Sequence, residues 1–182
     1  PSPVARRIFV GIVVLLLAAL AALGAGAVVS GLRVFGAALA ALALWLLRQD
    51  VARRTVRQPG LTGFIALCLL SGYVWLLAGG GLLALQPALP LLMDAALHAV
   101  FVGFVLAMVF GHAPIIFPAI LRVKLPYHAS FYLPLALLHL SLLLRVAGDL
   151  AGDAAWRAQG GLGNALCIAV FIATMAAAVW RG

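Results

Sequence analysis

Long apolar stretches, separated by short polar or glycine-containing segments, repeat along the whole 182-residue chain. A helix needs roughly 20 mostly apolar residues to cross the hydrocarbon core of a bilayer. The pattern therefore predicts an all-α integral membrane protein, with six transmembrane helices in a bundle that forms a single domain over residues 1–182. The predicted spans cover about residues 8–29, 32–47, 61–85, 91–113, 129–146 and 162–180.

The connections are predicted from turn residues and prolines. Ser30-Gly31 marks a tight turn between the first two spans, and a polar loop over residues 149–157 separates the last two. Pro114 has no N–H to bond the carbonyl of Phe110, so the fourth span kinks or ends there. The apolar piece that follows is then either an interfacial turn or a bent continuation of the helix.

The first apolar stretch ends in LGAGA, a sequence that could pass for a signal-peptide cleavage site. Its apolar run is longer than the 7–15 residues of an ordinary signal-peptide core. We therefore expect an uncleaved first helix.

Composition excludes several function classes. The chain is 66% hydrophobic and only 9% charged, whereas soluble domains are about 25% charged. No room remains for a soluble catalytic domain, and the chain is not expected to be an enzyme on its own. The net charge of +8 does not indicate nucleic-acid binding, because the basic residues cluster at the ends of apolar segments. The predicted partner is the lipid bilayer.

The positions of the basic residues predict an orientation. With six spans and a cytoplasmic N-terminus, the outer side receives only Arg33, Arg145 and Arg157. The cytoplasmic side receives the other nine, which are Arg6, Arg7, Arg48, Arg53, Arg54, Arg57, Arg122, Lys124 and Arg181. This excess follows the positive-inside rule, so both termini are expected to be cytoplasmic. The Ala/Leu/Gly/Arg-rich composition favours a bacterial cytoplasmic (inner) membrane.

Small residues recur at every fourth position in two spans, a pattern that lets helix backbones approach closely in lipid. In the fourth span they are Ala95, Ala99, Gly103, Ala107 and Gly111, and in the sixth Gly161, Ala165, Ala169, Ala173 and Ala177. These rows predict contacts within the chain, with other membrane subunits or in a homo-oligomer.

The four histidines are the main candidates for chemistry, since polar side chains within a membrane are costly and often functional. His98 and His112 are 14 residues apart and His128 and His139 are 11 apart, so each pair returns to nearly one helix face. Matching depths predict the cross-helix pairs His98/His139 and His112/His128. Facing imidazoles suit bis-axial ligation of haem b. Arg145 is placed to pair with a haem propionate or, equally, to snorkel to the interface.

Other roles remain open for these residues. His98 and His139 suit interhelical hydrogen bonds, for which Ser71, Tyr73 or Ser141 are the expected partners. His128 suits an interfacial position, and His112 suits a cap before Pro114. The two cysteines, Cys68 and Cys167, are expected to be core residues rather than a disulfide or a metal pair.

The segment HAVFVGFVLAMVFGHAPIIFP (98–118) resembles the NnrS-type membrane proteins, which are similar in turn to the catalytic subunit of haem-copper oxidases. The matching positions are His98, Ala99, Gly103, Phe104, Met108, Gly111 and Pro118. The resemblance implies haem or metal binding by His98 and an association with respiratory or nitrogen-oxide metabolism. The adjacent His-His copper ligands of the oxidases are absent, so oxygen or nitric oxide reduction by this chain alone is not expected.

Three functions follow from the sequence. The first is a haem-b-binding membrane subunit that carries electrons or anchors a redox complex. The second is a cofactor-free structural subunit that packs against partner helices. The third is a small transporter, which would predict similarity between residues 1–90 and 91–182 that the chain does not show.

Overall fold

The computed structural model describes residues 2–85 and 87–181, which form helices and turns but no strand. Six helical runs are long and apolar enough to cross a membrane, which confirms the predicted all-α class. They are α1 (Pro3–Gly24), α2 (Val28–Gln49), α4 (Leu61–Leu85), the joined α5 (Pro90–His98), η1 (Ala99–Leu106) and α6 (Ala107–Leu121), the joined η2 (Ala129–Phe131) and α7 (Tyr132–Ala151), and α8 (Ala154–Trp180). The short helix α3 (Ala52–Thr55) lies between α2 and α4.

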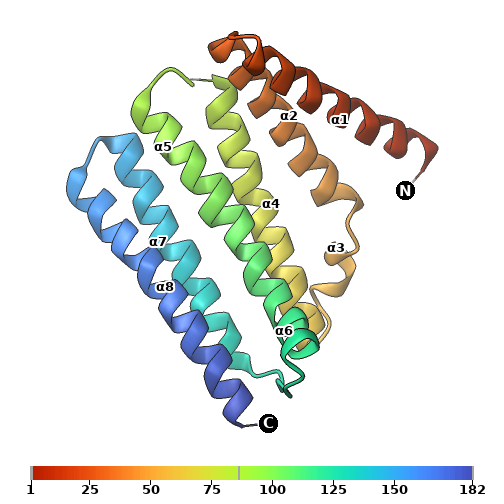
Figure 1. Ribbon diagram of the computed structural model, residues 1–182, viewed down its shortest axis with the longest axis vertical. Coiled ribbons are helices and arrows are strands. Elements are labelled where there is room, and N and C mark those ends of the chain that lie inside the picture. Colours follow the sequence, from red (N-terminus) through yellow and green to blue (C-terminus); the bar gives the residue numbers. More distant parts are fainter. Residues whose placement is uncertain (1, 86, 182) are drawn as a thin grey trace.

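The run from α5 to α6 lies between α4 and α7 (Figure 1). Helix α8 packs on α7 at one side of the molecule, and α2 packs on α4 at the other, with α1 against α2. Successive helices alternate in direction, so the α1–α2, α4–α5 and α7–α8 connections lie at one end (Figure 1). Both chain termini point away from that end.

The apolar core lies where α4, α6, α7 and α8 meet. Its largest buried side chains include Phe64, Phe110 and Phe131, which have no exposed surface. Cys68 and Cys167 belong to the same core and are free thiols. The prediction that both cysteines are core residues is therefore confirmed.

The two rows of small residues have opposite surroundings. Every member of the row in the fourth span is buried, and a Cβ added to Gly103 would lie 2.4 Å from Cγ of Trp75. This row lets α5, η1 and α6 approach α4 and α7, as predicted. In α8, by contrast, Ala165, Ala169 and Ala173 are exposed. The described part of the chain therefore leaves the row on α8 without a covering helix.

The fourth span differs from the prediction in its length and register. It contains the eight-residue π-helix η1 and then continues through Pro114 and Pro118, ending at Leu121 instead of residue 113. A membrane helix tolerates these prolines because neighbouring groups and local adjustments satisfy the freed carbonyls. A π-helix closes each hydrogen bond one residue later than an α-helix. His98 and His112 therefore do not keep the one-face register of an uninterrupted α-helix.

Two turns also lie elsewhere than predicted. The first two helices join at Gly26, whose positive φ of 85° suits glycine, and Ser30-Gly31 lies inside α2. The expected polar loop 149–157 is mostly helical, because Gly152 ends α7 in the left-handed region and Asp153 caps α8. The sixth helix thus begins at Ala154 instead of residue 162.

Candidate functional site

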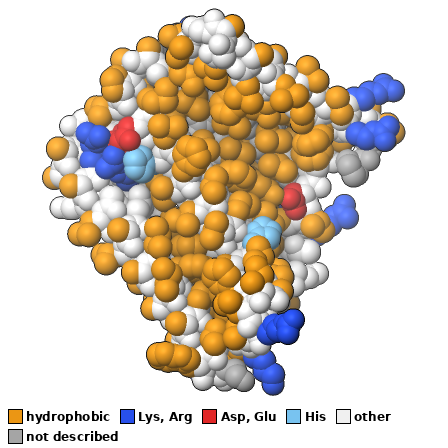
Figure 2. All heavy atoms as spheres, viewed as in Figure 1, with side chains coloured by type: hydrophobic (Ala, Val, Ile, Leu, Met, Phe, Trp, Pro, Cys, Tyr) orange, Lys and Arg blue, Asp and Glu red, His pale blue; other side chains and the backbone are white. Residues whose placement is uncertain are grey.

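Five ionisable side chains meet near the shared end of α5, α7 and α8. Asp94 comes from α5, Arg145 and Asp149 from α7, and Arg157 from α8. Arg157 donates to Asp149 through Nε at 2.6 Å and to Asp94 through a terminal nitrogen at 3.2 Å. Arg145 donates to Asp94, and its Nε lies 3.5 Å from Asp149 Oδ2. His98, on the last turn of α5, lies 3.3 Å from Asp94 Oδ1. We call these five residues the charged cluster, and Figure 2 shows charged and histidine side chains gathered in this region.

Glycines allow α7 and α8 to approach closely enough to build the charged cluster. A Cβ on Gly148 would lie 2.7 Å from the backbone nitrogen of Arg157. A Cβ on Gly160 would lie 2.5 Å from the backbone nitrogen of Arg145. Arg145 also donates to the carbonyl oxygen of Arg157 at 3.0 Å. The two arginines are therefore fixed by backbone packing as well as by their acidic partners.

The cluster contains possible metal ligands, but its charges already balance. One ligand atom from each of Asp94, His98 and Asp149 lies within 4.8 Å of the others. Both carboxylates are bound by the guanidinium groups of Arg145 and Arg157, so two negative charges meet two positive charges. A cation at this position would have to displace an arginine from a buried carboxylate. The arrangement is best described as an ion-pair network that joins three helices.

His139 lies elsewhere and is fully hydrogen-bonded. Its Nδ1 accepts from Nε1 of Trp75 at 3.0 Å, and its Nε2 lies 2.9 Å from Oγ of Ser71. Because an indole nitrogen can only donate, Nδ1 carries no proton and Nε2–H donates to Ser71. Ser71 in turn donates to the carbonyl of Leu67 at 2.8 Å. No nitrogen lone pair of His139 is left for iron in this arrangement.

His98 and His112 have a different arrangement. Nδ1 of His98 donates to the carbonyl of Asp94 at 2.9 Å, and Nδ1 of His112 donates to the carbonyl of Met108 at 2.8 Å. No hydrogen bond within the described residues uses Nε2 of either imidazole. Metal-binding histidines commonly have one ring nitrogen held in this way. These two histidines, both partly exposed, therefore keep a free lone pair.

His128 has a capping role. It is exposed, and its Nδ1 accepts from the backbone nitrogen of Ser130 at 3.1 Å, at the start of η2. The position of His128 at a membrane interface stays a prediction. Within the part of the chain that the structure describes, no hydrogen bond joins two histidines. His98 belongs to the charged cluster, His139 contacts α4, and Arg145 is engaged by two aspartates.

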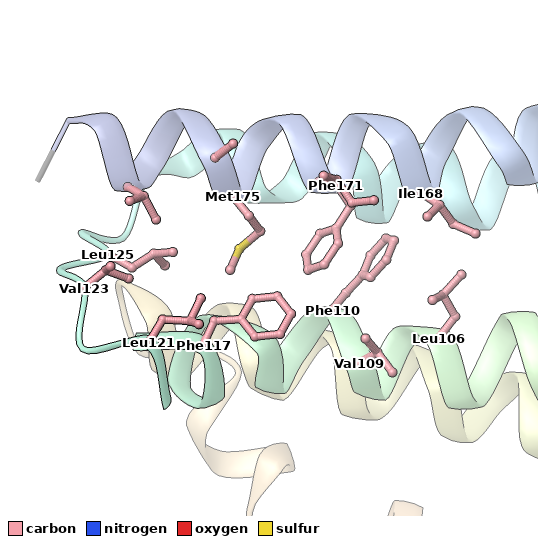
Figure 3. Close-up of a pocket in the computed structure, with 13 residues that line it drawn as sticks. Leu106, Val109, Phe110, Phe117, Leu121, Val123, Leu125, Ile168, Phe171 and Met175 are labelled. Carbon is pink, nitrogen blue, oxygen red and sulfur yellow. The ribbon is translucent and has the colours of Figure 1, made fainter. Parts of the chain in front are cut away.

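The largely apolar cavity between α6 and α8 contains none of the four histidines, and Met175 is the one lining residue with a side chain that can ligate haem iron. It has a volume of about 420 Å³, and the stacked rings of Phe110 and Phe171, 4.0 Å apart, border it (Figure 3). Its lining residues are Leu106, Val109, Phe110, Phe117, Leu121, Val123, Leu125, Ile168, Phe171, Ile172, Met175, Ala176 and Val179. The predicted axial ligands and this cavity therefore do not coincide.

Sequence reasoning missed three partners in these networks. Nothing in the sequence indicates Trp75 as a donor to His139, or Asp94 and Arg157 as partners of one another. A signal for the cluster exists, because Asp94 precedes His98 and Arg145 precedes Asp149 by four residues, one helical turn. Ser71, one of three expected hydrogen-bond partners, does bind His139.

Comparisons with known proteins add a family but no activity. No curated protein and no solved structure matches the chain, and no comparison links it to the NnrS-type proteins. The model of the family described as "Domain of unknown function (DUF8744)" matches residues 1–180. Because the match covers nearly all of the sequence, the chain belongs to the DUF8744 family.

Proposed function

We propose that the chain is a cofactor-free structural subunit of a membrane assembly, and that the outer face of α8 binds the same face of a second copy. The observation that carries this proposal is the exposed row Ala165, Ala169 and Ala173 in α8. Without a hydrophobic drive between helices in lipid, close packing of small residues promotes association. An isologous contact needs a single self-complementary face, which such a row provides.

The interior of the molecule supports a structural role. The hydrogen bonds of His139 tie α4 to α7, and the ion pairs of the charged cluster tie α5 to α7 and α8. On the Ala/Leu/Gly/Arg-rich composition the assembly would lie in a bacterial cytoplasmic membrane, and on the positive-inside count both termini would lie in the cytoplasm.

Cysteine cross-linking in native membranes tests the proposal. Ala169→Cys should give a disulfide-linked dimer of the full chain, because residue 169 would face its own copy. The wild-type chain is the background, since both of its cysteines are buried. Leu140→Cys, on an exposed position of α7 (65% exposed), is the matched control. Equal cross-linking at both positions would indicate random collision, and none at Ala169→Cys would refute the dimer.

A haem-b-binding redox subunit is the second candidate, and the free Nε2 of His98 favours it. His98 lines a cavity of about 230 Å³ with Asp94, Leu97, Phe101 and Val102, beside the arginines of the charged cluster. A bound haem would supply one-electron chemistry, and a second axial ligand would have to come from elsewhere than His139. His112 is the other histidine with a free nitrogen.

A reduced-minus-oxidised visible spectrum of the purified chain separates the two candidates. If His98 binds haem, His98→Ala should lose the α band, whereas His139→Leu should keep it at equal protein yield. A well-folded preparation without haem absorbance would favour the cofactor-free subunit. Loss of the band only in His139→Leu would contradict the hydrogen-bond assignment made above.

A further inference from the structure

An apolar groove between α1 and α2 continues into a cavity lined by arginines. The groove has a volume of about 430 Å³ and is lined mainly by apolar side chains of the two helices, which are Ala5, Ile8, Ile12, Ala41, Leu44 and Trp45. Arg48 and Gln49 close one end of it. The same two residues line a second cavity of about 550 Å³ together with Asp50, Val51, Arg53 and Arg54. The two cavities therefore adjoin through Arg48 and Gln49.

The arginine cavity has uncompensated positive charge. Its one acidic residue is Asp50, whose Oδ1 accepts from the backbone nitrogen of Ala52 at 2.8 Å and whose Oδ2 accepts from the hydroxyl of Tyr73 at 2.6 Å. Within residues 2–85 and 87–181, no ion pair involves Arg48, Arg53 or Arg54, and all three side chains are exposed. Asp50 thus positions the loop. One terminal nitrogen of Arg53 donates to the carbonyl oxygen of Arg48 at 3.2 Å, and each of the three guanidinium groups keeps further N–H donors for an anion.

Trp45 indicates where the groove lies relative to the membrane. Its indole Nε1 donates to the carbonyl of Ala5 at 2.9 Å, and its ring packs on Phe9 with centroids 4.9 Å apart. Tryptophan is enriched at the level of lipid headgroups. The arginine cavity follows Trp45 by one turn of α2, so we expect it at the polar end of a membrane-embedded groove.

We propose that this joined site binds one anionic phospholipid of the surrounding bilayer, with an acyl chain in the α1–α2 groove and its phosphate on Arg48, Arg53 and Arg54. Charge complementarity favours this ligand, because an apolar groove that ends at three guanidinium groups without an acidic partner among the described residues matches a molecule with an apolar tail and an anionic head. Guanidinium groups bind phosphate through paired hydrogen bonds. The site is independent of the α8 face, so its failure would leave the proposed function intact.

Quenching of tryptophan fluorescence by brominated lipids tests the site in the full-length protein. The protein is reconstituted into phosphatidylcholine vesicles that contain a small fraction of brominated phosphatidylglycerol or brominated phosphatidylcholine. The part of the quenching that disappears in Trp45→Phe reports lipid in the groove. At equal fractions, we expect stronger Trp45-dependent quenching by the anionic lipid. Equal quenching by the two lipids would overturn the proposal.

Two variants that each lose three positive charges show whether the arginine cavity causes the preference for the anionic lipid. In the combined variant Arg48→Gln, Arg53→Gln and Arg54→Gln, the preference should fall by roughly fivefold for each arginine removed. The control removes three basic residues that line neither cavity (Arg122→Gln, Lys124→Gln and Arg181→Gln) and should keep the preference. An equal loss in the control would show a general surface potential and overturn the proposal.

Inorganic phosphate separates a lipid site from a free-anion site. Added phosphate should not reduce the Trp45-dependent quenching beyond the effect of sodium chloride at equal ionic strength, because the acyl chain contributes to binding. Specific displacement by phosphate would show that the arginines select a soluble anion and would refute the assignment to a lipid.

Discussion

Replacing Asp149 by asparagine removes a carboxylate whose side chain has no exposed surface, while leaving side-chain volume nearly unchanged. In the wild type this carboxylate lies 2.6 Å from Arg157 Nε and 3.5 Å from Arg145 Nε. In Asp149→Asn both arginines stay at the end of the bundle, but one of their two carboxylate partners is neutral. The variant therefore tests whether the charged cluster holds α5, α7 and α8 together.

The structure sets the expected size of this effect. Removing one partner of a buried ion pair costs about 3–5 kcal/mol, because a charge remains buried without compensation. Here Arg145 keeps Asp94, and the Arg157 side chain is 33% exposed and can bind water. The lower end of the range applies, so we expect a loss of about 3 kcal/mol, or roughly 100-fold in the unfolding equilibrium.

Unfolding of the detergent-purified chain by added dodecyl sulfate, followed by circular dichroism, measures this loss. Asp153→Asn is the matched control, because Asp153 is an N-cap that accepts from the backbone nitrogens of Ala155 and Trp156. Asparagine caps a helix as well as aspartate does, so this variant should unfold like the wild type. If Asp149→Asn unfolds at the same midpoint as Asp153→Asn, the cluster contributes nothing and the reasoning fails.

Three further predictions use the same unfolding assay. Gly80→Ala should destabilise the chain, because its Cβ would lie 2.7 Å from a backbone nitrogen of α2. Gly81→Ala has free space for its Cβ and should stabilise the chain by up to about 1 kcal/mol. A Gly80→Ala variant more stable than Gly81→Ala would contradict the close contact between α2 and α4. His139→Leu should lower the free energy of unfolding by about 1–3 kcal/mol, because it leaves the Trp75 N–H unpaired and removes the donor to Ser71, which keeps its own bond to the carbonyl of Leu67; no loss would refute this network. Trp45→Phe should lower the free energy of unfolding by about 1 kcal/mol, because it removes the hydrogen bond from Trp45 to the Ala5 carbonyl in α1. Faster proteolysis of the N-terminal helix would be a second readout.

The sequence predicts the class of the fold because bilayer thickness sets the length of each apolar run. It also predicts that the small residues of the fourth span are buried, since close backbone approach in lipid needs them. It does not predict the π-helix, because η1 is apolar throughout and carries no periodic pattern of polar positions from which a change of register could be recognised.

The sequence indicates which polar residues matter, but it does not indicate which side chains they contact. Helical spacing places His139 on a face of α7, but it does not say whether an imidazole, a serine or an indole lies opposite. Asp94 and Arg157 are 63 residues apart, and their contact depends on how α8 packs against α7 and α5. Spacing along the chain cannot predict such a pairing, because it does not give the packing of three helices against one another.

The packing of α2 on α4 has a consequence for how the protein is made. Gly36 of α2 and Gly80 of α4 bring the two backbones into close contact, yet α2 leaves the ribosome first. At about 5–20 residues per second, the α1–α2 hairpin would wait for seconds in the membrane before its partner surface is synthesised. The arginines after α2 are present from the beginning of that wait and would hold the hairpin at its depth and orientation. The segment that binds lipid phosphate in our proposal would thus also act during biogenesis, as the anchor of an unfinished protein.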